Sequence, residues 1–222
     1  MKTKVIYEDE AVLVCYKPAG LAVQTAVSYQ EDMLHELKNY LSSKSGEKNP
    51  YLGMIHRLDQ PVEGLLVFAR TKTVAAALTK QLTEGILSKK YVAVLCGVPD
   101  EKTGILVNYL KKDGKSNLAK VTDEKESDAK RAELSYRIRR EKEQCCLAEI
   151  EIKTGRFHQI RAQMSHLGYP LLGDIKYGAS IRGQLALCAY HLEFENPMSR
   201  KRQSFVIKPE NSAFAEFLPD IL

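Results

Sequence analysis

The sequence lacks several features that would assign a broad class at once. No apolar run approaches the length needed to span a membrane, so we expect no transmembrane helix. Acidic residues at positions 8–10 stand where a signal peptide needs an apolar core, which indicates a cytoplasmic location. A Walker loop, a GxGxxG motif after a strand, a fixed-period repeat and low-complexity segments are also absent. The absence of the first two motifs means that the sequence gives no indication of a nucleotide cofactor.

Metal and disulfide patterns are missing as well. The five cysteines are an odd number, and no two of them have C-x-x-C spacing. The histidines show no zinc-type spacing either, so we expect no metal. Most of the cysteines lie in apolar, strand-like runs, and we interpret them as small buried hydrophobic residues in a reducing compartment. They are Cys15, Cys96, Cys145, Cys146 and Cys188.

Length and charge set weaker bounds. A chain of 222 residues with 44% hydrophobic residues is long enough for one large domain or two small ones. The net charge of +5 fits a polyanionic partner, although many proteins without such a partner carry as much. Alternation of apolar and polar residues in 132–139 and 148–153 indicates an antiparallel hairpin with one buried face.

Hydrophobic periodicity predicts further elements along the chain. Helices are expected at 31–41 and 73–88, and a closing helix contains Phe214 and Phe217, which we interpret as core residues. Residues 111–130 are rich in charge and poor in large apolar groups, which favours a solvated, mobile loop. Strands are expected at 5–7, 11–16, 89–97, 184–194 and 204–207.

Residues 56–70 consist of a polar cluster followed directly by an apolar run. Pro61 disfavours helical geometry at Gln60, so Asp59 should lie on a loop that leads into a buried strand. A carboxylate beside Arg57 and His56 on such a loop is a candidate for chemistry. From these residues alone, a loop aspartate that only caps or pairs locally is an equally good interpretation.

A second polar cluster lies about a hundred residues later, in 154–161. His158 and Arg161 are three positions apart, so a helix would place them on one face. Thr154 and Gly155 indicate the start of that helix, where free backbone N–H groups favour anions such as phosphate. The alternative is a basic helix start that simply faces solvent.

The motifs His56-Arg57-Leu58-Asp59 and Gly155-Arg156-Phe157-His158-Gln159-Ile160-Arg161 resemble signatures of the RluA-type pseudouridine synthase family. Lys17-Pro18-Ala19-Gly20 before them and Lys89-Lys90-Tyr91 between them match two further family motifs in order. The resemblance covers about residues 5–210 and implies the compact form without an S4 domain. One departure is Val62-Glu63, where the family usually has Thr-Ser.

This resemblance implies an α+β fold, namely one catalytic domain spanning residues 1–222. Its mixed, mostly antiparallel sheet would lie in two lobes with flanking helices and a central RNA-binding cleft. By resemblance Asp59 is the catalytic nucleophile, Arg161 pairs with it, and Tyr91 contacts the target base and removes a proton. Arg57 would fill the gap left by the displaced base. The remaining expected RNA contacts are His56, Arg156, His158 and Leu187.

The implied function is isomerisation of specific uridines in structured RNA, either rRNA or tRNA, to pseudouridine without cofactor or metal. An alternative is a catalytically silent RNA-binding or RNA-folding protein on the same scaffold, which the Val62-Glu63 departure keeps open. A third, a hydrolase that uses Asp59 and Glu63 as an acid–base pair, is disfavoured because Pro61 excludes helical proximity of the two. RNA is the expected partner and a membrane is not. The oligomeric state is open, with a monomer as the expectation.

Overall fold

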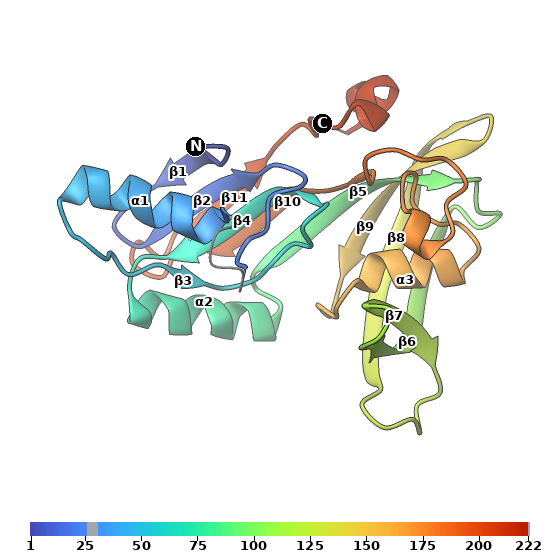
Figure 1. Cartoon of the computed structure of the whole chain (residues 1–222), viewed down its shortest axis with the longest axis horizontal. Coiled ribbons are helices and arrows are strands. Elements are labelled where there is room, and N and C mark those ends of the chain that lie inside the picture. Colours follow the sequence, from blue (N-terminus) through green and yellow to red (C-terminus); the bar gives the residue numbers. More distant parts are fainter. Residues whose placement is uncertain (26–30, 222) are drawn as a thin grey trace. The chain divides into compact units, whose positions relative to one another are not determined.

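The structure is a computed structural model that describes residues 1–25 and 31–221 (Figure 1). It has the expected α+β class, with a mostly antiparallel sheet and helices beside the strands. The chain forms two compact units: residues 1–89 with 189–210, and residues 90–188 with 211–222. Each unit therefore contains segments that are distant in sequence, and each is described by itself.

The first unit contains a sheet whose order is β1-β2-β4-β10, with β3 paired to β4 and β11 paired to β10. Its β2 and β4 are antiparallel to each other and buried at every position, and apart from the charged Lys17 at the end of β2 and Glu63 at the start of β4 their sequences are apolar runs. Both faces of these strands are therefore covered. The strands are β1 (Lys4–Glu8), β2 (Val12–Lys17), β3 (Gly53–Met54), β4 (Glu63–Ala69), β10 (Leu187–Glu195) and β11 (Arg202–Val206).

Helix α1 (Met33–Ser45) begins after Asp32, whose carboxylate accepts a hydrogen bond from the His35 N–H at 2.8 Å. It ends at Gly46, which has a left-handed φ of 75° and donates its N–H to the Ser42 carbonyl. The helix is confirmed, but it continues past the predicted end at residue 41. The polar residues after Leu41 sustain the helix until the glycine stops it.

Helix α2 (Lys72–Glu84) begins after Thr71, whose hydroxyl accepts from the Val74 N–H at 3.2 Å. Gly85 ends it with φ 75°, so the prediction that this helix reaches residue 88 is wrong at its C-terminus. Leu87 is still buried, although it lies beyond the helix. Its hydrophobicity reflects packing against the core and not helical periodicity.

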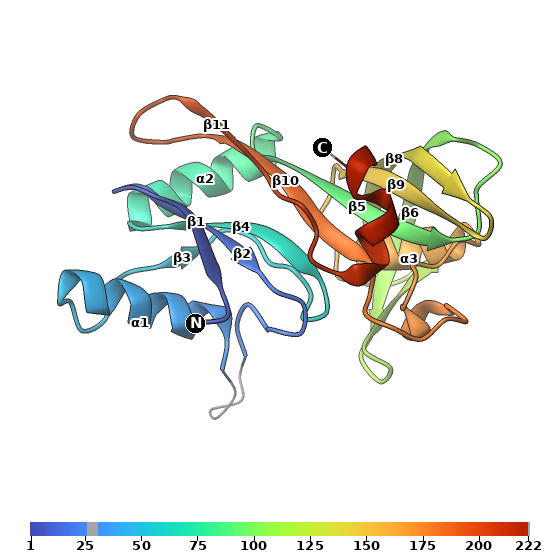
Figure 2. The same cartoon turned by 90° about the horizontal axis from the view of Figure 1, so that it is seen from above.

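The two helices cover opposite sides of the strands in the first unit (Figures 1 and 2). Val74 and Leu78 of α2 join a core cluster with apolar residues of β2, β4 and β10. The buried residues of α1 are Met33, Leu37 and Leu41, at the helical spacing that the sequence showed. This double cover explains the unbroken burial of β2 and β4.

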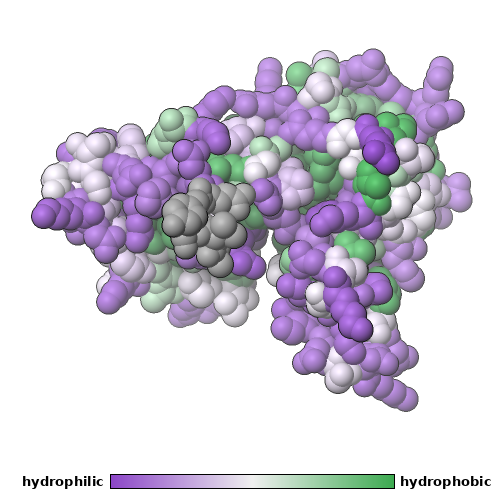
Figure 3. Space-filling model, viewed as in Figure 1, coloured by the Kyte–Doolittle hydropathy of each residue, from purple (hydrophilic) through white to green (hydrophobic). Residues whose placement is uncertain are grey.

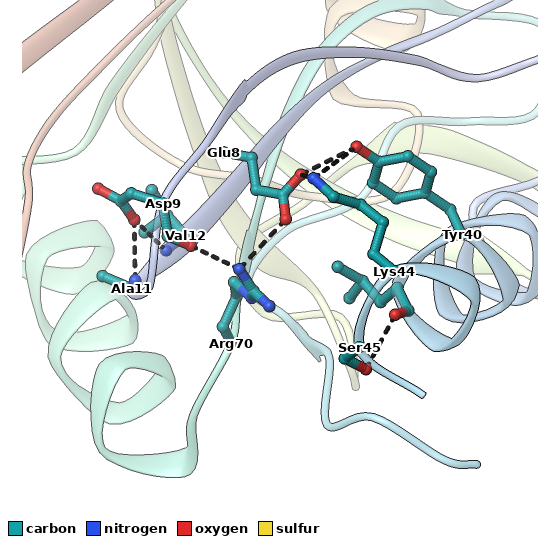
Figure 4. Close-up of polar contacts among 9 residues, drawn as sticks. Glu8, Asp9, Ala11, Val12, Tyr40, Lys44, Ser45 and Arg70 are labelled. Atoms are coloured by element: carbon teal, nitrogen blue, oxygen red, sulfur yellow. Dashed lines mark hydrogen bonds and ion pairs between the residues drawn. The ribbon is translucent and has the colours of Figure 1, made fainter. Parts of the chain in front are cut away.

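A polar cluster around Glu8 ties the end of β1 to α1 and to the end of β4 (Figure 4). The Glu8 carboxylate accepts from Tyr40 Oη at 2.9 Å and Lys44 Nζ at 2.8 Å, and from Arg70 Nη1 at 3.2 Å. Arg70 also donates to the Asp9 carbonyl at 2.9 Å. These partners lower the pKa of Glu8 although partial burial opposes them. Three sequence-distant elements are thus joined through one carboxylate.

The second unit contains the sheet order β5-β9-β8-β6-β7, in which neighbouring strands from β5 to β7 pair antiparallel. The predicted hairpin is confirmed as β8 and β9, and Phe214 and Phe217 are buried in the closing 3-10 helix η2 as expected. The elements are β5 (Ser88–Cys96), β6 (Thr103–Asp113), β7 (Leu118–Thr122), β8 (Lys130–Lys142), β9 (Cys145–Ile152), α3 (Gln159–His166), η1 (Ile175–Tyr177) and η2 (Ser212–Asp220).

The prediction of a mobile loop over residues 111–130 is wrong for much of that range. Strands β6 and β7 form an antiparallel hairpin there, with Asp113 paired to Leu118 next to the turn. Leu110 and Ala119 are buried in a cluster with Tyr177, although each is followed by a lysine that is less buried. The surface over this hairpin is mainly hydrophilic (Figure 3), which explains why composition alone suggested a loop.

The cysteines are confirmed as free thiols, of which Cys15, Cys146 and Cys188 are buried and the other two are half-buried. Burial raises the pKa of the Cys146 thiol to about 12. Within the part of the chain that the structure describes, no helix is long and apolar enough to cross a membrane.

Candidate active site

Asp59 lies half-buried on the segment between β3 and β4, as the Pro61 argument predicted. The Val62 N–H donates to the Asp59 carbonyl at 3.0 Å and closes a turn through Gln60 and Pro61. Leu58 before the turn and Val62 after it are both buried. The Asp59 side chain is therefore presented by a short turn that is anchored on both sides.

Gly64 lets β4 start immediately after this turn. Its φ is 135°, in the region that favours glycine, and an added Cβ would lie 2.5 Å from the Ala189 carbonyl oxygen of β10. The backbone of Ala189 is too close to accept any side chain at this position. The Asp59 turn is thus attached to a strand that contacts its neighbour backbone to backbone.

Lys17 is the site residue that sequence reasoning missed. It is fully buried at the end of β2, where lysine is rarely found unless its charge is compensated. Its Nζ donates to the carbonyls of Leu21 at 2.7 Å, Pro18 at 3.0 Å and Gln60 at 3.0 Å. The sequence placed Lys17 in a turn that breaks a strand. It gave no signal that the ammonium reaches the residue after Asp59.

The negative charge of Glu63 acts on Lys17, although the three hydrogen bonds of the Lys17 ammonium go to backbone carbonyls. The carboxylate is buried on β4 and accepts from Tyr16 Oη at 2.6 Å and from the Glu210 N–H at 3.1 Å. Burial lowers the pKa of Lys17 to about 7, and the charges of Asp59 and Glu63 oppose that shift. Two acids and one lysine thus form a charge cluster beneath the turn.

The two residues before Leu58 differ in exposure. Arg57 is exposed, whereas His56 is buried and accepts a hydrogen bond from the Val67 N–H at its Nε2, at 3.4 Å. Burial, with a further contribution from Lys89, lowers the pKa of His56 well below its usual value. Its Nδ1 has no hydrogen-bond partner among the described residues. The RNA contacts predicted for Arg57 and His56 stay predictions.

Arg161 lies on α3 in the second unit, where it forms a buried ion pair with Asp174. Its Nε donates to one carboxylate oxygen at 2.6 Å and its Nη2 to the other at 2.7 Å. The guanidinium also lies over the Tyr177 ring, 4.9 Å from the centroid. Asp174 was not among the predicted site residues, so this two-pronged partner was missed.

His158 stands before α3 with a left-handed φ of 51°. Its Nδ1 lies 2.9 Å from Tyr177 Oη. Burial, with contributions from the positive charges of Arg161, Lys176 and Lys112, lowers the pKa of His158 to about 3. A neutral, buried imidazole therefore supports the start of α3. Its predicted contact with RNA stays a prediction.

The helix start expected at residues 154–155 is wrong by four residues, because α3 begins at Gln159. The Gln159 side chain folds back and accepts from the Thr154 hydroxyl at 2.8 Å and from the Arg156 N–H at 2.9 Å. These bonds hold residues 154–158 in a turn outside the helix. Arg156 itself is exposed, and its Nε donates to the Arg131 carbonyl at 2.9 Å.

Tyr91 on β5 and Leu187 at the start of β10 complete the predicted set, and both are buried in the second unit. The structure thus brings Arg161 and His158 together around Tyr177, and it places Asp59 with Arg57 and His56 in the first unit. Because Asp59 belongs to one unit and Tyr91 and Arg161 to the other, their direct interaction stays a prediction.

Comparisons with known proteins agree on one family. A model described as RNA pseudouridylate synthase matches residues 11–166. The chain is 32% identical to ribosomal large subunit pseudouridine synthase D of Zymomonas mobilis, over 91% of this chain and 68% of the relative. It is 30% identical to ribosomal large subunit pseudouridine synthase C of Buchnera aphidicola, over 98% of this chain and 70% of the relative.

A solved structure shares the fold. Human RNA pseudouridylate synthase domain containing 4 has a TM-score of 0.79 at 22% identity, and the match covers 98% of this chain and 92% of that one. Fold and motifs together define an RNA-modifying enzyme of the isomerase class. The chain belongs to the RNA pseudouridylate synthase family, and the resemblance to its RluA type is confirmed.

Proposed function

We propose that this enzyme converts specific uridines in structured RNA to pseudouridine, with Asp59 as the catalytic nucleophile. The observation that carries the proposal is the Asp59 turn, which presents a half-buried carboxylate beside the exposed Arg57 at the start of a rigid strand. The family match spans this turn. A carboxylate held on a rigid element suits chemistry that needs a fixed distance to the ribose.

The reaction breaks the N1–C1′ bond of uridine, turns the base and forms a C5–C1′ bond. Positive charge develops on the sugar when the first bond breaks, and an ionised carboxylate stabilises or traps that charge. Asp59 takes this role. Arg161 is proposed to pair with Asp59 and hold it ionised, through the part of its guanidinium that does not bind Asp174.

The second step removes the C5 proton, and N1 of the product carries a hydrogen, so the reaction is an isomerisation without an oxidant. Tyr91 is the proposed proton acceptor, and Leu187 the proposed apolar wall beside the base. The target uridine must leave its stack to be reached. The exposed Arg57 is proposed to fill the gap, with Arg156, His158 and His56 contributing to the RNA-binding surface or its support.

Large-subunit ribosomal RNA is the proposed substrate class. Two of the relatives named above are large ribosomal subunit pseudouridine synthases, and both are at least 30% identical to this chain. Recognition of RNA by proteins usually targets loops and irregular ends, where bases can be splayed out. A structured loop of rRNA is therefore the first substrate to test, and tRNA is the second.

The test compares the parent protein with Asp59→Ala and Asp59→Asn on transcribed rRNA and tRNA that contain no pseudouridine. We expect both variants to lose product formation, because neither side chain carries a carboxylate. RNA binding should change by less than about tenfold, or about 1.4 kcal/mol, because the fold and the expected RNA contacts of Arg57, Arg156 and His158 are unchanged. Pseudouridine is mapped by mass spectrometry after nuclease digestion.

The matched control is Asp100→Asn, which removes an exposed carboxylate from the loop after β5. It should keep the parent rate. Robust product from Asp59→Ala would remove Asp59 from the mechanism. Binding of RNA without any product from the parent protein would favour the silent RNA-binding alternative, and release of free uracil would favour a hydrolase.

A further inference from the structure

The three carbonyl partners of Lys17 favour its protonated form. An ammonium carries three N–H donors and no acceptor, whereas a neutral amine has two donors and a lone pair. The Lys17 Nζ donates to three separate carbonyls at 2.7–3.0 Å. Only the charged form can make all three bonds, and loss of the proton would direct a lone pair at a carbonyl oxygen.

These bonds join two loops that carry different parts of the site. The Pro18 and Leu21 carbonyls belong to the turn after β2, and the Gln60 carbonyl belongs to the Asp59 turn. The same Gln60 carbonyl also accepts from the Gly20 N–H at 2.8 Å, and Gln60 Nε2 donates to the Gly20 carbonyl at 3.0 Å. Lys17 thus connects the turn after β2 to the Gln60 carbonyl, which directly follows Asp59.

A fully buried ammonium needs negative charge nearby. The acids whose charges act on Lys17 are Asp59, from the turn before β4, and Glu63, from β4 itself. Asp59 is only half-buried on its turn, whereas Glu63 is 2% exposed and accepts hydrogen bonds from Tyr16 Oη and the Glu210 N–H. Glu63 is therefore the more deeply buried of the two acids.

We propose that Lys17 and Glu63 are positioning residues, in which the buried Glu63 carboxylate keeps Lys17 protonated so that its three hydrogen bonds hold the Asp59 turn. This inference rests on the proposed function for its effect on catalysis, but the coupling between the two side chains can be tested without any reaction. It gives a use to the carboxylate that stands where the family usually has a hydroxyl residue.

The consequence is a dependence on pH with a defined sign. Burial depresses the pKa of Lys17 to about 7, and the negative charges of Glu63 and Asp59 raise it from a still lower value. Removal of the Glu63 charge must therefore lower the pKa of Lys17 further. Lys17 would then lose one of its three hydrogen bonds at a lower pH, which would weaken the link between the two turns, and the alkaline fall in kcat would move to lower pH.

The first experiment measures the coupling directly. The 13Cε signal of Lys17 is followed by NMR from pH 5 to pH 10 in protein with labelled lysine, with Lys17→Met for assignment. We expect Glu63→Gln to lower the pKa of Lys17, because the amide keeps the shape and an acceptor oxygen but not the charge. Tyr16→Phe is the matched control, because it removes a hydrogen bond to Glu63 without changing charge.

The second experiment measures kcat and KM for pseudouridine formation across the same pH range. Glu63→Gln should move the alkaline limb of kcat to lower pH with little change in KM, and Glu63→Asp should restore part of the shift. Lys17→Met should lower kcat about 100-fold at the acidic end of the range and remove the alkaline limb that Lys17 contributes, because a displacement of the nucleophile by about 1 Å has an effect of that order. A merely structural role would change the yield of folded protein and not this pH profile.

Each result decides a separate part of the proposal. An unchanged pKa of Lys17 in Glu63→Gln would overturn the countercharge role. A lowered pKa with an unmoved alkaline limb would overturn the link to Asp59. If the parent protein forms no pseudouridine, the proposed function fails, while the NMR titration still decides whether the two side chains are coupled.

Discussion

The two units bury a cation in different ways. In the first unit, Lys17 is surrounded by three neutral carbonyls, and the acids that compensate its charge act over a longer distance. In the second, Arg161 is bound on two nitrogens by a single carboxylate, Asp174, at 2.6 and 2.7 Å. In the first arrangement, neutral carbonyls accept the hydrogen bonds and separate acids supply the negative charge. In the second, one carboxylate does both.

The difference indicates what each cation is suited for. A guanidinium is always charged and its planar fork matches a carboxylate, so Arg161 keeps both its charge and its two hydrogen-bond donors to Asp174 near neutral pH. A lysine loses its proton when burial and weak compensation lower its pKa, so the Lys17 link is adjustable. Stability should therefore depend more on the second pair, and pH response more on the first.

Asp174→Ala should have the largest effect on stability. It removes the carboxylate that binds two nitrogens of Arg161, a guanidinium only 4% exposed. Removal of one partner from a buried ion pair costs about 3–5 kcal/mol. Urea unfolding at pH 7, followed by probes placed in each unit, would measure the loss.

The comparison variant is Glu63→Gln, which should cost only roughly 1 kcal/mol because Lys17 can give up its proton and one of its three hydrogen bonds instead of remaining a buried charge without compensation. Asp174→Asn should lie between the two, since the amide keeps one acceptor oxygen but no charge. Equal losses for Asp174→Ala and Glu63→Gln would show that the two units do not differ in how their buried cations contribute to stability.

Local sequence patterns were sufficient for much of the fold. The apolar runs of β2 and β4, the helical spacing of Met33, Leu37 and Leu41, and the alternation in β8 and β9 each predicted the element that forms. The β6–β7 hairpin was missed because its burial depends on Tyr177, which is 58 residues from Ala119. No local pattern carries that information.

The same distinction applies to the site. The position of Asp59 on a turn before a strand follows from Pro61 and the apolar run beside it, which are local features. The role of Lys17 depends on the Gln60 carbonyl, 43 residues away, and the partner of Arg161 is 13 residues away outside the helix. Motif order located these residues, but their hydrogen bonds follow from tertiary packing.

Tyr177→Phe should have an intermediate effect on the second unit. The Tyr177 hydroxyl accepts from the Ala119 N–H at 2.7 Å and lies 2.9 Å from His158 Nδ1. A buried backbone N–H left without its acceptor costs about 1–3 kcal/mol, so thermal and urea unfolding should show a loss of that size. Hydrogen exchange should also accelerate at Ala119.

The matched variant in the first unit is Tyr40→Phe, in the polar cluster around Glu8 (Figure 4). It should cost less than about 1 kcal/mol, because Glu8 keeps Lys44 and Arg70 as partners. If Tyr177→Phe costs no more than Tyr40→Phe, the hydroxyl of Tyr177 is not what joins the β6–β7 hairpin to η1.

At neutral pH the smallest effect should be that of His158, whose contribution appears only as the pH falls. Its pKa is lowered from 6.5 to about 3 by burial, so the unfolded chain takes up a proton in this range that the folded protein does not. The free energy of unfolding should therefore fall as pH drops from about 6.5 towards 3, by at most about 1.4 kcal/mol per pH unit. His158→Gln should flatten that slope, as measured by urea unfolding at several pH values.

His56 in the first unit tests whether the two units share this property. Burial lowers its pKa well below the usual value, so its contribution has the same sign. His56→Gln should flatten the slope further when it is combined with His158→Gln, because the two groups lie in separate units and their effects should add. A double variant with the parent slope would mean that neither imidazole is held neutral in the folded protein, and acid sensitivity would then arise from the carboxylates alone.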